Sequence, residues 1–205
     1  MMSDLRTRGR PTGLTGASLL AVARDVLLEN GYAGTSMEEI AKRARISKAS
    51  LYREHGSKRA LYAAVVEHWT AAGRDAMRPA LDDLRGSRDV RSGLVRLAET
   101  MRTGILSPPV MAMRMLVTAE AATQPEVAAA YLEQSWHRNI RNLAAALDDL
   151  TVAGRLRIDD PVEAAEQFTW LVIGAPMNAR MLGGEGADAP SITGAVDLFL
   201  ARYSR

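Results

Sequence analysis

The side chains best suited to chemistry in this sequence lie in the run SKASLYREHGSK at residues 47–58. Lys48 and Arg53 supply positive charge, while Ser50 and Tyr52 supply hydroxyl groups that donate and accept hydrogen bonds. Such groups contact phosphate oxygens and the edges of bases in the grooves of duplex DNA. The run therefore indicates nucleic-acid binding.

Catalysis is not indicated by the sequence. The three histidines, His55, His68 and His137, lie far apart, and none has the H-E-x-x-H spacing of a metal site. No serine stands in a nucleophile elbow, and no glycine-rich phosphate loop follows a strand pattern. Because there is no cysteine, the chain has neither a disulfide framework nor a thiolate metal site. We expect a protein that is not an enzyme and needs no cofactor or metal.

The spacing around the basic run predicts two short helices joined by a tight turn. Ser36 is followed three residues later by Glu39, which is the pattern of a capping box at a helix start. Ile40 then begins an apolar face at helical spacing. Ser47 is the expected cap of the second helix, and Leu51 is expected to point back into a small core. The outer side of the second helix keeps Lys48, Ala49, Ser50, Tyr52 and Arg53.

These features resemble the TetR/AcrR family of bacterial transcriptional regulators over about residues 15–62. The resemblance implies an all-α fold, in which an N-terminal three-helix helix-turn-helix DNA-binding domain precedes a helical ligand-binding and dimerisation domain. The later segment RLRIDDPVEAAEQFTWLVIGAPMNARMLG is similar to the effector and dimerisation region of the AefR-like branch. The pairs that carry the family pattern are Gly31-Tyr32, Thr35-Ser36, Ile40-Ala41, Ile46-Ser47, Leu51-Tyr52 and Ser57-Lys58.

Three residues depart from the family pattern. Arg45 stands where the family usually has glycine, and a non-glycine residue in a left-handed turn costs on the order of 1 kcal/mol. Either the turn differs here, or a phosphate contact by Arg45 offsets the strain. Glu54 could accept a hydrogen bond from cytosine N4, but an ion pair with Lys58 four residues later is the favoured interpretation. His55 replaces an aromatic or apolar residue.

The expected DNA contacts fall into two kinds. Ser50 and Arg53 are expected to read base edges, which distinguish one base pair from another. A second set is expected to hold the DNA backbone, because the helix capped by Ser57 has an anion-binding amino end. The full set of expected contacts on the two helices and their flanks is Thr35, Ser36, Arg45, Ser47, Lys48, Ala49, Ser50, Tyr52, Arg53 and Lys58.

Basic residues concentrate toward the amino end of the chain. Residues 1–60 hold 11 Lys and Arg against 6 Asp and Glu, whereas residues 61–205 hold 15 against 18. Within the amino-terminal arm, the tetrapeptide with Arg8 and Arg10 (RGRP) resembles the core of an AT-hook, whose arginines enter a minor groove. The alternative is a solvated basic tail.

Length and hydropathy set the remaining bounds. The chain has 205 residues, 47% hydrophobic and 24% charged, which is enough for a two-part protein with a core. Its amino end lacks the apolar stretch of a signal peptide, and no run approaches the ~18 apolar residues of a membrane span. We expect a cytoplasmic protein with no membrane contact. Its parts are a flexible basic arm (1–14), a DNA-binding domain (15–60) and an effector-binding and dimerisation domain (61–205).

The body is predicted to be helical throughout. Pro79 is expected to kink or stop the fourth helix, which begins after Ser57. The long amphipathic segment from Pro125 to Ala153 is expected to form a single helix. The other predicted helices cover residues 15–30, 89–105, 108–122, 161–182 and 191–203.

Two segments near the carboxyl end are candidates for pairing subunits. The segment around residues 168–177 is apolar almost all round, so it must be buried on two sides. The family resemblance implies that the last two long helices form a four-helix bundle with a second copy. The alternative is ordinary core within one subunit. The expected dimer contacts are Trp170, Ile173, Gly174, Met177, Val196, Phe199 and Leu200.

An effector pocket is expected among the middle helices. Methionine adapts to varied apolar ligands, although it is also common in plain cores, which remains the alternative for each residue here. The expected wall and anchor residues are Met101, Met111, Arg114, Met115, Trp136, His137, Phe168 and Trp170.

From the sequence we therefore predict a homodimeric transcriptional regulator. It is expected to be a repressor that a small apolar or amphipathic effector releases from a palindromic operator. Two alternatives stay open. One is a helical small-molecule-binding protein with a degenerate DNA-binding head, and the other is a low-specificity architectural DNA binder.

Overall fold

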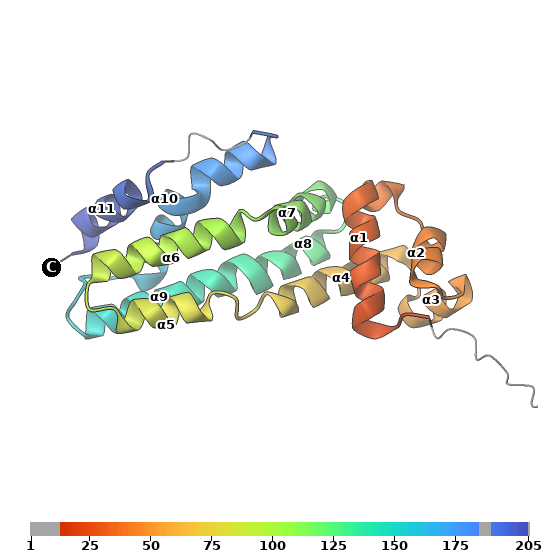
Figure 1. Ribbon diagram of the computed structural model, residues 1–205, viewed down its shortest axis with the longest axis horizontal. Helices are drawn as coiled ribbons and strands as arrows, with labels where there is room; N and C mark the ends of the chain where they lie inside the picture. The colour runs from red at the N-terminus through yellow and green to blue at the C-terminus, as the bar shows by residue number, and fades with distance from the viewer. Residues whose placement is uncertain (1–12, 185–189, 205) are drawn as a thin grey trace, which may run out of the picture. The chain divides into compact units, whose positions relative to one another are not determined.

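The computed structural model of the chain describes residues 13–184 and 190–204 (Figure 1). These residues form helices, with a single antiparallel bridge that pairs Leu156 with Ser204. They divide into two compact units, Met1–Trp69 and Thr70–Arg205. The division falls nine residues after the boundary expected from the sequence, because the first part of the fourth helix belongs to the amino-terminal unit.

Four helices build the amino-terminal unit, and their bounds are α1 (Gly16–Gly34), α2 (Met37–Ala44), α3 (Lys48–His55) and the start of α4 (Lys58–Ala72). The predicted inner stripe of α1 is buried through Leu19, Val26 and Leu27. Ile40 of α2 and Leu51 of α3 are fully buried with it. The three-helix arrangement predicted from the sequence is therefore present.

Gly31 interrupts α1 near its end. Its backbone lies at φ 68° and ψ 172°, a combination that a side chain disfavours and glycine adopts readily. The helix predicted over residues 15–30 ended next to this glycine. The chain instead turns at Gly31 and then makes one further helical turn.

The second unit contains the remaining helices. The core of this unit forms where α10 packs against α9, α11 and α6, and where α5 packs against α6 and α9. Their bounds are α5 (Arg78–Gly86), α6 (Val90–Ile105), α7 (Pro108–Glu120), α8 (Pro125–Tyr131), the π-helix η1 (Leu132–His137), α9 (Arg138–Val152), α10 (Pro161–Met181) and α11 (Ile192–Tyr203).

Two predictions about this unit were wrong. Pro79 does not end a helix but occupies the first turn of α5, where a missing N–H is tolerated. The helix that was predicted from Pro125 to Ala153 is divided by the π-helical turn η1. Hydrophobic periodicity could not show that turn, because it adds only one residue to the repeat.

Among the described residues, no helix is both long enough and apolar enough to cross a membrane.

Candidate nucleic-acid interface

Ser36 begins α2 by capping its first turn. The Ser36 Oγ accepts a hydrogen bond from the Glu39 backbone N–H at 3.1 Å. The reciprocal half of the predicted capping box does not form, because the Glu39 carboxylate instead accepts from Asn30 Nδ2 (3.2 Å) and from Arg43 (2.9 Å). The cap fixes where α2 starts, and the Glu39 side chain ties α2 to α1.

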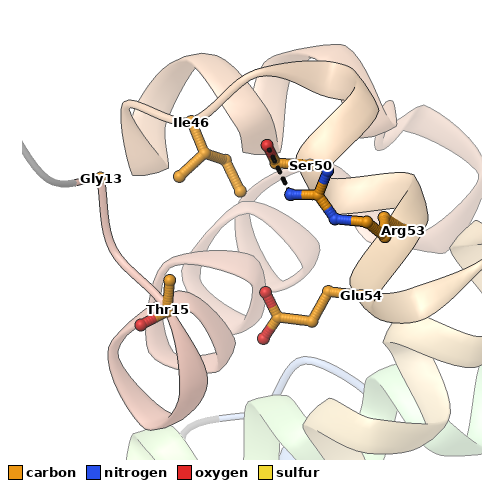
Figure 2. A pocket seen from close by; sticks show the side chains of 6 residues that line it. All are labelled: Gly13, Thr15, Ile46, Ser50, Arg53 and Glu54. Carbon is orange, nitrogen blue, oxygen red and sulfur yellow. Dashed lines mark hydrogen bonds between the residues drawn. The ribbon is translucent and has the colours of Figure 1, made fainter.

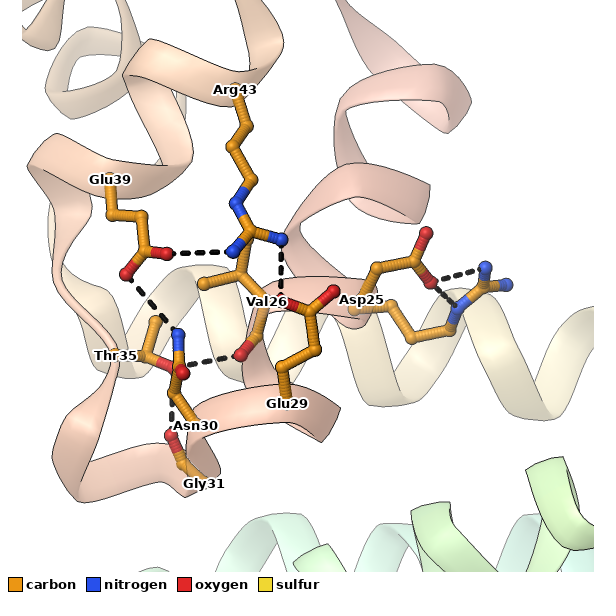
Figure 3. A network of polar contacts seen from close by, with 9 residues as sticks. Asp25, Val26, Glu29, Asn30, Gly31, Thr35, Glu39 and Arg43 are labelled. Carbon is orange, nitrogen blue, oxygen red and sulfur yellow. Dashed lines mark hydrogen bonds and ion pairs between the residues drawn. The ribbon is translucent and has the colours of Figure 1, made fainter.

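Arg43 completes this link between α1 and α2, as Figure 3 shows. Its guanidinium lies 2.6 Å from Glu29 of α1 and 2.9 Å from Glu39 of its own helix. The hydrogen bond that Arg43 donates to Glu29, with the charge of both carboxylates, raises the pKa of Arg43. One signal for this network is visible in the sequence, namely the spacing of four residues between Glu39 and Arg43. The partner on α1 could not be inferred from spacing.

Arg45 occupies the left-handed position in the turn between α2 and α3. Its backbone lies at φ 58° and ψ 35°, so the turn keeps the geometry for which glycine is the usual residue. Of the two alternatives that the sequence left open, a different turn is therefore excluded. The Arg45 side chain is exposed.

Gly13 packs directly on this turn. A Cβ atom at Gly13 would lie 2.3 Å from Ile46 Cγ2 and 2.5 Å from the Arg45 carbonyl oxygen. The neighbouring Leu14 N–H donates to the Ala44 carbonyl at 3.0 Å. The chain that follows the basic arm is thus fastened to the turn, and only glycine fits the closest contact. The arm residues Arg8 and Arg10 lie outside the described residues.

The helix α3 presents the predicted outer face. Ser47 Oγ accepts from the Ser50 N–H at 3.0 Å, which caps the helix as expected, and Leu51 is fully buried beneath it. Tyr52 is 43% exposed, and Lys48 and Arg53 are exposed as well. A short helix that buries one apolar side and exposes cations and hydroxyls has the form of a groove-reading helix.

A recess of about 460 Å³ adjoins this face, and Figure 2 shows the side chains around it. Arg53 Nη2 donates to Ser50 Oγ at 3.4 Å within the recess. The recess is lined by Gly13, Thr15, Ile46, Ser50, Arg53 and Glu54.

Glu54 accepts a hydrogen bond from the amino end of α1. Its Oε1 accepts a long hydrogen bond of 3.4 Å from the Gly16 N–H, where a negative charge also suits the helix dipole. A second polar neighbour is His55 Nε2 at 3.8 Å. The predicted ion pair between Glu54 and Lys58 is therefore wrong.

Lys58 closes the carboxyl end of α1. Its Nζ donates to the carbonyl oxygens of Tyr32 (2.7 Å) and Thr35 (2.9 Å), with Ala33 at 3.5 Å, and it lies 4.4 Å from the centre of the Tyr32 ring. A helix carboxyl end attracts positive charge, which explains a lysine at the unfavourable amino end of α4. These contacts occupy the ammonium donors, so the structure favours a positioning role over the predicted phosphate contact.

Thr35 is also turned inward. It is 3% exposed, and its hydroxyl donates to the Gly31 carbonyl at 2.7 Å, with the Val26 carbonyl at 3.3 Å. The prediction that this side chain contacts the DNA backbone is therefore corrected, since the hydroxyl holds α1 against the start of α2.

The expected effector residues divide into two groups. Met101, Met111 and Phe168 are buried in the core of the second unit, so for these the core alternative holds. His137 is exposed, and its Nδ1 lies 3.0 Å from Glu133, so the ring already has a polar partner outside the core.

The other expected effector residues come together. The Arg114 guanidinium lies 5.5 Å from the centre of the Trp136 ring, and the Trp136 and Trp170 rings lie 5.3 Å apart. Met115, beside Arg114 in sequence, is 46% exposed. Charge and aromatic surface therefore meet in this part of the second unit.

The expected dimer residues divide as well. Ile173, Met177, Val196 and Phe199 are buried in the core of their own unit, so they cannot form a surface. Trp170 is 52% exposed, while Gly174 and Leu200 are half-buried. Leu198 on α11 is 65% exposed.

Comparisons with known proteins agree with this architecture. A model described as "Bacterial regulatory proteins, tetR family" matches residues 19–65, and "AefR-like transcriptional repressor, C-terminal domain" matches residues 92–205. A solved TetR-family regulator from Mesorhizobium loti superposes with a TM-score of 0.85 at 27% identity, covering 91% of this chain and 95% of that one. The "Flavonoid-responsive Regulator FrrA" superposes with a TM-score of 0.68 at 28% identity and the same coverage.

Curated relatives match over shorter stretches. The "HTH-type transcriptional activator FasR" of Mycolicibacterium smegmatis is 31% identical over 115 residues, which is 54% of this chain and 49% of that protein. The "Uncharacterized HTH-type transcriptional regulator YdeS" of Bacillus subtilis is 30% identical over 50% of each. The chain thus spans about half the length of these curated relatives.

The fold and the exposed α3 define a helical protein with a helix-turn-helix head. Because the second family model alone covers more than half of the chain, the chain belongs to the TetR family of bacterial transcriptional regulators, with a carboxyl-terminal region of the AefR-like type.

Proposed function

We propose that this protein is a sequence-specific DNA-binding repressor that reads a palindromic operator as a homodimer. The single observation that carries the proposal is α3, whose cap, buried Leu51 and exposed Lys48, Tyr52 and Arg53 give it one inner and one outer side. A helix of this form fits the major groove, where each base pair shows a distinct pattern of donors and acceptors.

The DNA contacts are assigned from the exposed side chains of α2, α3 and the turn between them, in the amino-terminal unit. Ser50 and Arg53 read base edges, and Ser36, Arg45, Ser47, Lys48, Ala49 and Tyr52 adjoin the backbone. Arg8 and Arg10 add affinity in the neighbouring minor groove, since they precede Gly13, which packs on the turn that leads into α3. Lys58 and Thr35 do not contact DNA in this proposal; they stabilise the end of α1, on which the surface is built, through hydrogen bonds to backbone carbonyls.

The homodimer follows from the apolar side chains that remain exposed on the last two helices. Trp170 on α10 and Leu198 on α11 are large and more than half exposed. The half-buried Gly174 follows Trp170 by four residues, and the half-buried Leu200 follows Leu198 by two. A twofold pair would place two α3 helices in successive major grooves, about 34–36 Å apart.

The effector is a small apolar or amphipathic molecule. The cluster of Arg114, Trp136 and Trp170 supports a site for such a molecule, and a structural relative is named as flavonoid-responsive. The effector acts by population shift, so it must bind the DNA-competent and released states with different affinities.

Repression is preferred over activation because the matching carboxyl-terminal family is described as a repressor. A curated relative is named as an activator, so the direction of regulation needs its own test. Transcription from the bound promoter in a reconstituted system decides it, with repression expected as a drop in transcript when the protein is added.

DNA binding is tested by fluorescence anisotropy with labelled duplexes from the region upstream of the protein's own coding sequence. We expect a palindrome in that region to bind at least about a thousandfold more tightly than random duplex. Almost no binding to either would indicate a degenerate head. Binding with a steep salt dependence and little preference would indicate an architectural DNA binder.

A further inference from the structure

Arg114 on α7 makes neither a hydrogen bond nor an ion pair with any described residue. Its Nε is buried without a partner, although a guanidinium carries five N–H donors. Other half-buried arginines of the same unit are paired: Arg85 donates to Asp149 at 2.7 Å, and Arg102 donates to the Val172 carbonyl at 2.8 Å. An arginine held in the protein with its donors unused is a candidate anchor for a ligand.

Two aromatic rings hold this guanidinium in place. It lies 6.0 Å from the centre of the Tyr131 ring and 5.5 Å from that of Trp136, within reach of cation–π attraction. Trp136 in turn packs against Trp170 at 5.3 Å between ring centres. The charge therefore lies beside an apolar aromatic surface, and in the single chain part of that surface is exposed, because Trp170 is 52% exposed there.

The π-helix η1 is what brings the two rings to one side. Tyr131 and Trp136 are five residues apart, and in an α-helix that spacing places side chains about 140° apart around the axis. In a π-helix, residues five apart follow each other along the same side. Such turns are rare and are found frequently at functional sites, so η1 is a second observation at this place.

We propose that Arg114 binds the carboxylate of an amphipathic effector whose apolar or aromatic body packs on Trp136 and Trp170. The proposal rests on the effector-responsive function above and specifies the chemical class of the effector. A carboxylate matches the planar fork of a guanidinium and can accept two parallel hydrogen bonds from it. Arg138 also has an unpaired buried Nη1, but no aromatic ring accompanies it.

The burial of Arg114 Nε can make ligand affinity depend on the arrangement of the surrounding side chains. A carboxylate that pairs with Nε as well as with an Nη group can do so only after the side chains that cover Nε move, so that bound arrangement differs from the one described here. The ligand then binds one arrangement better than the other, which is the condition for a population shift. The DNA-binding equilibrium can follow the ligand only through such a difference.

The test uses 2-naphthoate and 2-naphthamide, two ligands of similar shape that differ in charge. Their affinities for the purified full chain are measured by ligand-observed NMR titration without DNA. For the wild type we expect naphthoate to bind at least tenfold more tightly than naphthamide. Arg114→Gln should reduce that preference to twofold or less, and Arg114→Lys, which keeps the charge, should retain part of it.

Arg141→Gln is the matched control, because Arg141 is an exposed arginine that pairs with Glu133 at 2.8 Å on the adjoining α9. It should leave the naphthoate preference unchanged. Equal affinities in the wild type, no naphthoate binding at millimolar concentration, or a preference that survives Arg114→Gln would each overturn the proposal. Circular dichroism confirms that each variant is folded.

The outcome is separate from the test of DNA binding. A chain that binds its operator but shows no preference for naphthoate would retain the proposed regulator and lose the carboxylate site. A chain that shows the preference but binds no DNA would retain the carboxylate site and lose the proposed regulator.

Discussion

Arg102 Nε donates a hydrogen bond of 2.8 Å to the backbone carbonyl of Val172, in the middle of α10. That carbonyl lacks its usual helical partner, because the residue four positions later is Pro176, which has no N–H. Arg102 on α6 therefore replaces a helical hydrogen bond that the sequence of α10 removes. Partial burial at this place lowers the pKa of Arg102, although the side chain remains charged at neutral pH.

We predict that Arg102→Met lowers the free energy of unfolding by about 1–3 kcal/mol, because it leaves a buried carbonyl without a donor. The same substitution should have a smaller effect in a Pro176→Ala background, where the helix supplies its own N–H to Val172. Urea unfolding of the four chains of this double-mutant cycle measures the coupling. If the effects of the two substitutions were additive, the link between Arg102 and Pro176 would be wrong.

Lys58 and Lys48 give a matched comparison between a positioning lysine and a DNA-contacting one. Lys58→Met should lower the free energy of unfolding by about 1–3 kcal/mol, since it removes the donor shared by the Tyr32 and Thr35 carbonyls. It should leave the salt dependence of operator binding unchanged. Lys48→Met should keep the stability but reduce the slope of log affinity against log salt by about 1, as loss of one phosphate contact does.

Salt titrations of DNA binding, paired with thermal unfolding of the same variants, separate the two roles. A reduced slope for Lys58→Met with unchanged stability would restore the phosphate contact that the sequence first suggested.

Arg53 and Tyr52 are neighbours with different expected effects on recognition. Arg53→Ala should weaken operator binding by about 1–3 kcal/mol and relax the preference at particular base pairs, because a base-edge contact is lost. Ser50→Ala should act in the same way but more weakly. Tyr52→Ala should reduce affinity equally for operator and random DNA. Binding to a set of single-base operator variants measures this, and an equal loss on all sequences for Arg53→Ala would exclude it as a base reader.

The local parts of the head could be predicted from the sequence because their causes lie within a few residues. Ser47 caps α3 three residues before its donor, and Leu51 is buried by helical periodicity, both as expected. Glu54 and Lys58 were predicted wrongly, because a four-residue spacing was the visible signal while the true partners lie far away in sequence. Glu54 bonds the N–H of Gly16, 38 residues earlier, and Lys58 bonds the Tyr32 carbonyl, 26 residues earlier.

The surface of the second unit was harder to predict for a related reason. The segment around residues 168–177 is apolar almost all round, so composition could not tell its inner from its outer side. Packing against α9, α11 and α6 decided that Ile173 faces inward and Trp170 outward. The stacking of Arg114 on two rings depends on the π-helical turn, which has no signature in the hydrophobic pattern.

Gly13 offers the last test, because its contact with the turn joins the basic arm to the head. In Gly13→Ala the new methyl group would overlap Ile46 Cγ2 and the Arg45 carbonyl oxygen, so residue 13 must move away from the turn. We expect operator affinity to fall several-fold, with little change in the melting temperature, since the contact lies at the edge of the fold. Gly86→Ala is the control, because a Cβ there meets nothing within 4 Å. The decrease should vanish when residues 1–12 are deleted from both proteins, because the substitution then has no arm to displace. A decrease that persisted in the shortened chains would assign the effect to the turn itself, and the fastening of the arm by Gly13 would have no part in DNA binding.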